Sequence, residues 1–352
     1  MEVIKYILTN LYSLLYKLVF KNKTLIILGN PYGNVTGHIK CCYYLLKSEN
    51  LKGVFIVKER VTNKNELRKV SFRTFILLLK TKSIIYTHNP TDIFPFIPKG
   101  VKKINIWHGM PIKPIGYNSK IEQIWIKNKI KNKLSPYLKN DLLIVNSFYW
   151  VNFFSDSWRF PKNRILPLGS LVSAYLNKYH DEIISELSKR FSNKRNHIIF
   201  APTFRNDGSD YEYINKTLQF FSKLTQYDFI VKLHPNTNLT FNENYVNIIF
   251  PNNIDLFDLF LFSDLLITDY SSIFYEYLTV KPNCILFQTD KKEYEKINGK
   301  LNPVNESLKI YYAQNIKELN DNILLLMAEL DKKKQQDFVK FDVDKFIKNI
   351  VL

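Results

Sequence analysis

Short runs of apolar residues alternate with longer amphipathic stretches along most of the chain. The runs are rich in Ile, Leu, Val and Phe, a pattern typical of parallel strands that are buried on both faces. Because helical stretches separate the runs, strand and helix alternate as they do in doubly wound α/β folds. The predicted strands of the first half are 24–28, 53–57, 83–86, 102–107 and 142–146, and those of the second half are 197–200, 229–233, 247–250, 264–268 and 283–287.

These two consecutive sets of strands predict two Rossmann-like, doubly wound domains with a cleft between them. A length of 352 residues suits two domains of ordinary size. We expect an amphipathic N-terminal helix over 1–23, a first domain over 24–180, and a second domain with C-terminal helices over 181–352. Ligands of doubly wound sheets bind just beyond the carboxyl ends of the strands, so functional side chains are expected there.

The N-terminal stretch is apolar with a few polar interruptions. Lys5, Asn10 and Lys17 interrupt the apolar residues of 3–20, and no small-residue cleavage site follows, which argues against a secretory signal. A spanning helix needs roughly 20 nearly uncharged residues, and this stretch falls short. Two interpretations stay open: a helix that lies along an anionic membrane surface, or an ordinary helix packed on the first domain.

The net charge is strongly positive. The chain carries 50 Lys and Arg against 32 Asp and Glu, a formal charge of +18. This excess favours a polyanionic partner, such as nucleic acid, an anionic membrane or a phosphate-rich substrate, but a genome rich in A and T produces it as well. Because no nucleic-acid motif is present and Lys is spread along the chain, we expect no nucleic acid partner.

The three cysteines are Cys41, Cys42 and Cys284, and they show no CxxC or Cys/His ligand spacing. This pattern indicates neither a zinc site nor a disulfide framework. It fits a reducing, cytosolic compartment.

A histidine follows a predicted strand in each half of the chain. His108 comes after the strand 102–107 and is followed by Gly109, which allows close backbone approach. His234 comes directly after the strand 229–233 and is followed by Pro235, which stops the strand. A neutral imidazole suits a general base near neutral pH, although each histidine alone fits a structural turn equally well. We expect the two histidines to face one cleft.

Hydroxyl and charged side chains follow other predicted strands. Ser271 and Ser272 lie between a strand and a helix, where free N–H groups and the helix dipole attract phosphate, and the alternative is simple helix capping. Thr203 and Arg205 form a candidate phosphate clamp or a solvated loop. Lys113 would add positive charge near a phosphate, and we expect it on the acceptor side. Further candidates are Asp269 and Glu276 for the nucleotide and its ribose, and Gly33 and Asn34, in an ordinary strand-to-helix turn or at the acceptor entrance.

The order of these segments resembles the CDP-glycerol glycerophosphotransferase family of teichoic-acid and capsule polymerases. The resemblance spans roughly 29–295 and rests on WHGMPIK (107–113), VNS (145–147), APTFR (201–205), KLHP (232–235) and DLLITDYSSIFYEY (264–277). It implies a GT-B arrangement with an acceptor-side first domain and a CDP-donor-binding second domain. It also implies a catalytic role for His108 and His234, and donor-phosphate binding by Thr203, Arg205, Ser271 and Ser272.

The implied reaction moves an alditol phosphate, glycerol phosphate before others, from a CDP-linked donor to a hydroxyl of a lipid-linked or polymeric glycan, with release of CMP. Peripheral attachment to the cytoplasmic face of the cell membrane is implied as well. No cofactor is required by the sequence, and Mg²⁺ accompanying the diphosphate is compatible with it. Two alternatives stay open: a GT-B glycosyltransferase that uses a nucleotide sugar, and a non-catalytic, basic nucleic-acid-binding protein.

Overall fold

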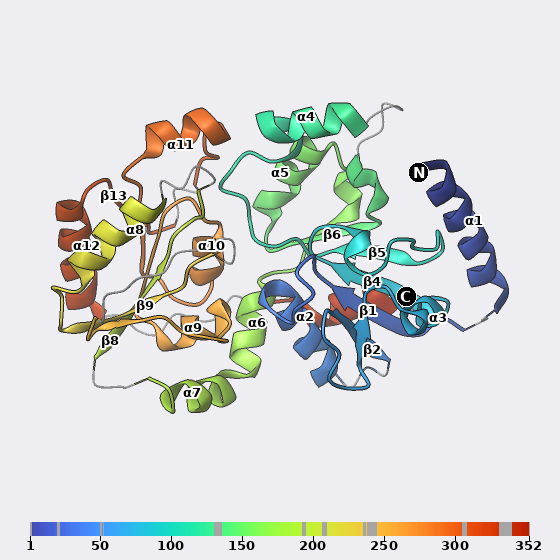
Figure 1. The fold of residues 1–352 in the computed structure, drawn as a ribbon, viewed down its shortest axis with the longest axis horizontal. Coiled ribbons are helices and arrows are strands. Elements are labelled where there is room, and N and C mark those ends of the chain that lie inside the picture. The colour runs from blue at the N-terminus through green and yellow to red at the C-terminus, as the bar shows by residue number, and fades with distance from the viewer. Residues whose placement is uncertain are drawn as a thin grey trace.

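The computed structural model describes residues 2–19, 22–49, 51, 53–129, 136–191, 195–205, 210–234, 237, 245–304, 308–330 and 340–351. It contains two domains side by side, each built around a parallel sheet that is flanked by helices (Figure 1). This arrangement confirms the predicted doubly wound α/β fold.

The first domain contains a seven-stranded sheet in the order β3-β2-β1-β4-β5-β6-β7. All of its strand pairs are parallel. The order reverses between β1 and β4, and such a switch point opens a crevice at the carboxyl ends of the strands. The strands are β1 (Leu25–Gly29), β2 (Val54–Lys58), β3 (Glu66–Arg68), β4 (Thr81–Tyr86), β5 (Lys102–Asn105), β6 (Leu142–Val145) and β7 (Ile165–Pro167).

Successive side chains of these strands point to opposite faces of the sheet. Ile84 packs into the cluster beneath α1 (Glu2–Val19) and α3 (Phe72–Leu78), and the next residue, Ile85, packs into the cluster beneath α2 (Gly37–Ser48) and α5 (Phe148–Trp158). Because both faces are covered, the interior strand β1 is a continuous apolar run, LIILG. A further helix, α4 (Lys120–Lys129), lies beyond β5 in the sequence.

The second domain contains a six-stranded sheet in the order β10-β9-β8-β11-β12-β13, again with parallel pairs. One face packs on α8 (Asp210–Phe221) and α12 (Ile316–Ala328). The other packs on α9 (Leu256–Phe262) and α10 (Ile273–Tyr277), in a cluster that continues into the first domain. The strands are β8 (Asn196–Ala201), β9 (Tyr227–Val231), β10 (Ile248–Ile249), β11 (Leu265–Thr268), β12 (Cys284–Phe287) and β13 (Tyr311–Ala313), and α11 (Lys291–Asn298) follows β12.

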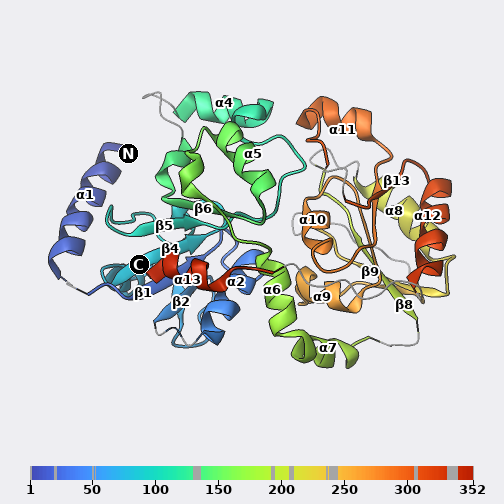
Figure 2. The same cartoon turned by 180° about the vertical axis from the view of Figure 1, so that it is seen from behind.

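The chain crosses between the domains twice. Helices α6 (Leu171–Lys178) and α7 (His180–Ser188) lead to the second domain, and α13 (Val343–Val351) returns to the first, as Figure 2 shows. There the Ser83 hydroxyl donates a hydrogen bond of 2.6 Å to the Ile350 carbonyl oxygen. The expectation that the C-terminal helices all belong to the second domain is therefore wrong for α13, because its apolar face is buried against the first sheet.

Helix α1 has one buried face and one exposed apolar face. Tyr12 and Tyr16 are 3% and 7% exposed, and the Tyr16 hydroxyl donates to the Thr81 carbonyl oxygen at 2.9 Å. The helix is thus packed on the first domain. Among the described residues, no helix is both long and apolar enough to span a membrane. The outward stripe consists of Ile7, Leu11, Leu14 and Leu18, which are all more than half exposed.

Candidate active site

The turn that carries His108 is made by an unusual backbone conformation. Strand β5 ends at Asn105, two residues before the predicted end, and Trp107 adopts a left-handed conformation with φ 54°. That conformation costs a residue with a side chain about 1–2 kcal/mol. The Trp107 amide donates to the Asn105 side-chain oxygen at 2.7 Å, and its ring packs on Phe154 and Trp158. These contacts hold the turn that presents His108.

His108 lies at the wall of a cavity between the two domains. Its Nδ1 faces the Thr87 carbonyl oxygen at 3.5 Å, and because a carbonyl only accepts, Nδ1 carries the proton and Nε2 is left as an acceptor. The ring is exposed and lines the cavity. The surrounding protein lowers the pKa of His108 well below its usual value, mainly through loss of hydration. The ring is therefore neutral at pH 7 and suits a general base.

Gly109 brings the histidine turn against the second domain. Its φ is +130°, and a Cβ atom added there would lie 2.6 Å from the Ser272 hydroxyl oxygen. Only glycine permits this approach. The His-Gly turn after β5 and the Ser-Ser turn after β11 are therefore in direct contact across the cleft.

The cavity has a volume of about 710 Å³ and is lined by residues of both domains. Its aromatic walls include Trp107, Phe204, Tyr270 and Tyr294, and such a mixture of aromatic and polar groups is typical of sites that bind small molecules. The predicted site residues that line it are His108, Lys113, Thr203, Arg205, His234, Ser271 and Ser272.

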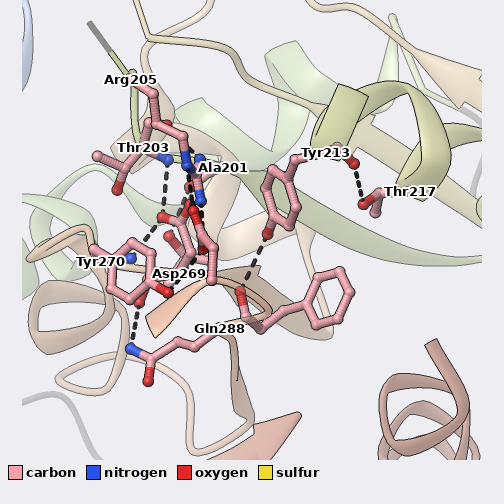
Figure 3. A network of polar contacts seen from close by, with 11 residues as sticks. Ala201, Thr203, Arg205, Tyr213, Thr217, Asp269, Tyr270 and Gln288 are labelled. Atoms are coloured by element: carbon pink, nitrogen blue, oxygen red, sulfur yellow. Dashed lines mark hydrogen bonds and ion pairs between the residues drawn. The ribbon is translucent and has the colours of Figure 1, made fainter. Parts of the chain in front are cut away.

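Arg205 is held by two carboxylates, as Figure 3 shows for one of them. Its Nε and one terminal nitrogen donate to the two oxygens of Asp290 at 2.9 and 3.1 Å, and it forms an ion pair of 3.2 Å with Asp269. Burial acts to raise the pKa of Asp290, but the bonds from Arg205 outweigh it and leave that pKa below its usual value. The guanidinium lines the cavity, yet its charge is already compensated by these partners.

Lys113 supplies positive charge from the first domain. Its ammonium nitrogen lies 5.3 Å from the centre of the Tyr294 ring, on the wall of the second domain. Among the described residues no carboxylate forms an ion pair with it. Burial lowers the pKa of Lys113, and burial together with the charge of Lys113 lowers the pKa of His234. Lys113 thus reaches from the first domain to the wall formed by the second, and its expected place on the acceptor side stays a prediction.

Three hydroxyl groups border the same space. The Thr203 hydroxyl is buried and has no hydrogen-bond partner among the described residues. Ser272 precedes α10 but its side chain makes no capping bond, and the Ser271 hydroxyl accepts only a long bond of 3.4 Å from the Ile273 amide. The helix capping that the sequence left as the alternative is therefore not formed by Ser272, whose hydroxyl lies beside Gly109. These hydroxyls are available to a ligand.

Asp269 and Glu276 do not line the cavity. Asp269 is fully buried, and one of its oxygens accepts from the Thr203 amide at 2.8 Å. Glu276 is 3% exposed and lies 3.1 Å from Nε2 of His38, which comes from the first domain. The expected contacts of these two carboxylates with the nucleotide and its ribose therefore stay predictions. In the structure, Asp269 orders the loop that carries Thr203, and Glu276 joins the domains.

Gly33 and Asn34 also lie outside the cavity lining. The Gly33 carbonyl oxygen accepts from the Glu59 amide at 2.8 Å, and the Asn34 carbonyl oxygen accepts from the Asn30 side chain at the same distance. These bonds describe the ordinary strand-to-helix turn that the sequence left as the alternative. Sequence reasoning missed Asp290, which borders the cavity just beyond the predicted strand 283–287, although the same strand-end rule pointed there.

Two parallel sheets whose strand ends face one cleft define the class of two-domain α/β proteins with the GT-B arrangement. Within this class, the chain belongs to the family described as CDP-Glycerol:Poly(glycerophosphate) glycerophosphotransferase, whose model matches residues 20–348.

The relatives are proteins of teichoic acid synthesis. The chain is 29% identical over 213 residues to the teichoic acid glycerol-phosphate primase of Bacillus subtilis (strain 168), a match that covers 57% of this chain and 54% of the relative. It is 24% identical over 320 residues to the teichoic acid glycerol-phosphate transferase of Staphylococcus aureus (strain NCTC 8325 / PS 47), with coverages of 83% and 80%. The chain spans about half the length of the first of these relatives.

Solved structures show the same fold. The wall teichoic acid polymerase TagF matches with a TM-score of 0.70 at 20% identity, covering 94% of this chain and 88% of TagF. The UDP-GlcNAc 2-epimerase from Methanocaldococcus jannaschii matches with a TM-score of 0.55 at 11% identity, covering 92% and 99%. At these identities, the likeness concerns the fold.

Proposed function

We propose that this protein transfers an alditol phosphate, glycerol phosphate in the first place, from a CDP-linked donor to a hydroxyl of a teichoic-acid-like or capsular polymer. The observation that carries the proposal is the contact of the His108–Gly109 turn with Ser272. This contact puts the neutral imidazole of His108 beside the serine hydroxyls that precede α10. Lys113 and His234 line the same cavity. A base next to a phosphate-binding surface is the arrangement that phosphoryl transfer needs.

In the proposed reaction, the acceptor hydroxyl attacks the phosphorus that carries the alditol. Nε2 of His108 takes the hydroxyl proton while the new O–P bond forms. The phosphoanhydride bond breaks, and its electrons leave with the phosphate oxygen of CMP. Lys113, His234, Ser271 and Ser272 stabilise the charge on the phosphate oxygens through positive charge and hydrogen bonds.

The donor is proposed from the family and its relatives. Curated relatives include primases named for glycerol phosphate and for ribitol phosphate, and a TagF variant was studied with CDPG. We propose CDP-glycerol first and CDP-ribitol second, with a lipid-linked or polymeric glycan as the acceptor. The ammonium of Lys113 and the imidazole of His234 line the cavity in which we propose that the diphosphate binds. We therefore propose that no resident metal is required and that Mg²⁺ enters, if at all, with the donor.

The place of action is proposed from α1. Its exposed stripe of Ile7, Leu11, Leu14 and Leu18 supports peripheral binding to the cytoplasmic face of the cell membrane. An acceptor anchored by lipid would be concentrated at such a surface. We propose that the product is a cell wall or capsule polymer, as the teichoic acid relatives suggest.

The test is incubation of the full chain with CDP-glycerol, CDP-ribitol and UDP-sugars in the presence of candidate acceptors. CMP release from a CDP-alditol, with and without EDTA, is the expected result. His108→Ala should lower turnover by roughly 10²–10⁴-fold because the general base is removed, while CDP-donor binding persists. Transfer from a UDP-sugar instead of a CDP-alditol would establish the glycosyltransferase alternative. Salt-sensitive nucleic acid binding without any turnover would establish the non-catalytic one.

A further inference from the structure

A second histidine, His88, lies directly against His108. It follows β4 as His108 follows β5, and neighbouring parallel strands bring their carboxyl ends to the same edge of the sheet. The two imidazole rings are stacked, with centroids 3.9 Å apart and planes within 2° of each other. The residues that line the donor cavity include His108 but not His88. His88 therefore contacts the proposed base and not the donor space.

The His88 ring is itself well held. Its Nδ1 lies 2.9 Å from the Thr87 hydroxyl oxygen, and its amide donates to Asp92 at 3.2 Å. The Asn105 side chain, which also accepts from the Trp107 amide, reaches the His88 carbonyl oxygen at 3.5 Å. One set of bonds thus ties the loop after β4 to the turn after β5, so the two rings are fixed relative to each other.

We propose that His88 is a positioning residue whose ring fixes the plane of the His108 imidazole and keeps water from one of its faces. In this arrangement Nδ1 of His108 stays on the Thr87 carbonyl and Nε2 stays directed at the acceptor hydroxyl. The inference rests on the proposed function, in which His108 is the base.

The electrostatics of the pair support this role. Burial lowers the pKa of His88 to about 4 and that of His108 well below its usual value. Two protonated rings at this separation would also repel each other strongly, so the pair takes up protons only in acid and as a coupled unit. The other titratable or charged groups that act on or lie near the pair are His38, Asp92, Lys113, Glu122, Lys139 and His234.

The experiment compares His88→Ala with His88→Phe. Phenylalanine keeps a flat ring against His108, whereas alanine opens that face to water. For His88→Ala we expect kcat to fall about 10–100-fold, because misplacement of a catalytic group by about 1 Å has this effect. We also expect the acid limb of the kcat/KM profile to move up toward pH 6.5, since the rehydrated His108 regains an ordinary pKa. His88→Phe should retain most of the wild-type turnover, and the acid limb of its kcat/KM profile should stay in place. His180→Ala on α7, which removes a histidine far along the chain from the pair, is the control.

A second measurement does not depend on turnover. The chain has six histidines, so ¹⁵N-histidine labelling and single-residue variants can assign the His108 ring in a pH titration. We expect the His108 ring to titrate well below its ordinary range in the wild type and in His88→Phe, and to titrate nearer pH 6.5 in His88→Ala. Unchanged kcat and titration in His88→Ala would overturn the proposal, and so would an effect on the acceptor KM alone. Equal losses of kcat in the Phe and Ala variants would also overturn the proposal, because a flat ring at position 88 would then not be sufficient to position His108.

Discussion

At the scale of single residues, the two strongest cations that line the cavity differ in their partners: Arg205 is paired with carboxylates, and Lys113 is not paired with any described carboxylate. Arg205, the most obvious phosphate-binding side chain in the sequence, is paired with Asp269 and Asp290. Its contribution to binding is therefore largely to hold the loop that carries Thr203. Lys113 has no such carboxylate among the described residues and reaches the wall formed by Tyr294. In the proposed function, we therefore expect the positive charge for the diphosphate to come from Lys113 of the first domain.

This reasoning predicts that Lys113→Met weakens donor binding. A hydrogen bond to a charged group contributes about 1.5–3 kcal/mol, so the dissociation constant of the CDP-donor should rise roughly 10–100-fold. Binding of cytidine, which has no phosphate, should change little. Isothermal titration calorimetry with both ligands measures this, with Lys296→Met on the exposed side of α11 as the matched control. A raised acceptor KM with normal donor affinity would return Lys113 to the acceptor side.

At the scale of elements, helices α2 and α10 join the two domains through a buried polar contact. His38 on α2 is 9% exposed and Glu276 on α10 is 3% exposed, with 3.1 Å between Nε2 and Oε1. Nearby, the Gly37 amide at the start of α2 donates to Asp255 at 2.7 Å, and Lys40 forms an ion pair with Asp258. The helix that follows the Ser-Ser turn is therefore positioned by the other domain.

We predict that Glu276→Ala destabilises the protein without removing nucleotide contacts. The variant leaves His38 buried without its partner, which costs about 1–3 kcal/mol of unfolding free energy. Glu276→Gln keeps a hydrogen-bonding side chain, so its unfolding free energy should be close to that of the wild type. Urea unfolding gives the stability, and CMP binding to the folded variants gives the affinity. Loss of CMP affinity at unchanged stability would restore the ribose contact that the sequence suggested.

At the scale of the whole molecule, one side of the first domain is apolar while the chain is basic overall. Helix α1 lies at the outer side of this domain, away from the second domain (Figure 1). Phe72, 79% exposed, belongs to the same aromatic cluster as Phe75, on which Tyr12 of α1 stacks. An exposed aromatic side chain of α3 thus lies close to α1. With a net charge of +18, this surface suits an anionic bilayer.

The corresponding prediction is that α1 carries the salt-resistant part of membrane binding. Replacing Leu11 and Leu18 with Asp should abolish co-sedimentation with anionic liposomes at high salt, because apolar burial is not screened. At low salt, part of the binding should remain, since each Lys near the surface contributes about 1 kcal/mol. The matched control places Asp at Leu324 and Leu325, which are exposed to a similar degree on α12 of the second domain. If the wild type ignores anionic liposomes at low salt, α1 serves only to cover the sheet.

The sequence by itself determined the two-domain α/β fold, the main strands and the strand-end residues that meet in the cavity. Parallel strands that are buried on both faces need continuous apolar runs, and their carboxyl ends collect polar groups, so both features are local and readable. The short strands β3, β7 and β13 were missed, because each has only three residues and such a run carries little pattern.

Only the tertiary structure decided which charges are compensated and which groups join the domains. Arg205 and Asp290 are 85 positions apart in the sequence, and His38 and Glu276 are 238 apart, so no local pattern reveals that they are partners. The stack of His88 on His108 likewise depends on β4 and β5 being neighbours in the sheet. Helix α13 buries Phe346 and Ile350 against the first domain. An apolar helix face of this kind could pack on either domain, so the sequence does not show which one it joins. These features depend on long-range packing, in which the partner of a side chain is set by the whole fold and not by its neighbours in the chain.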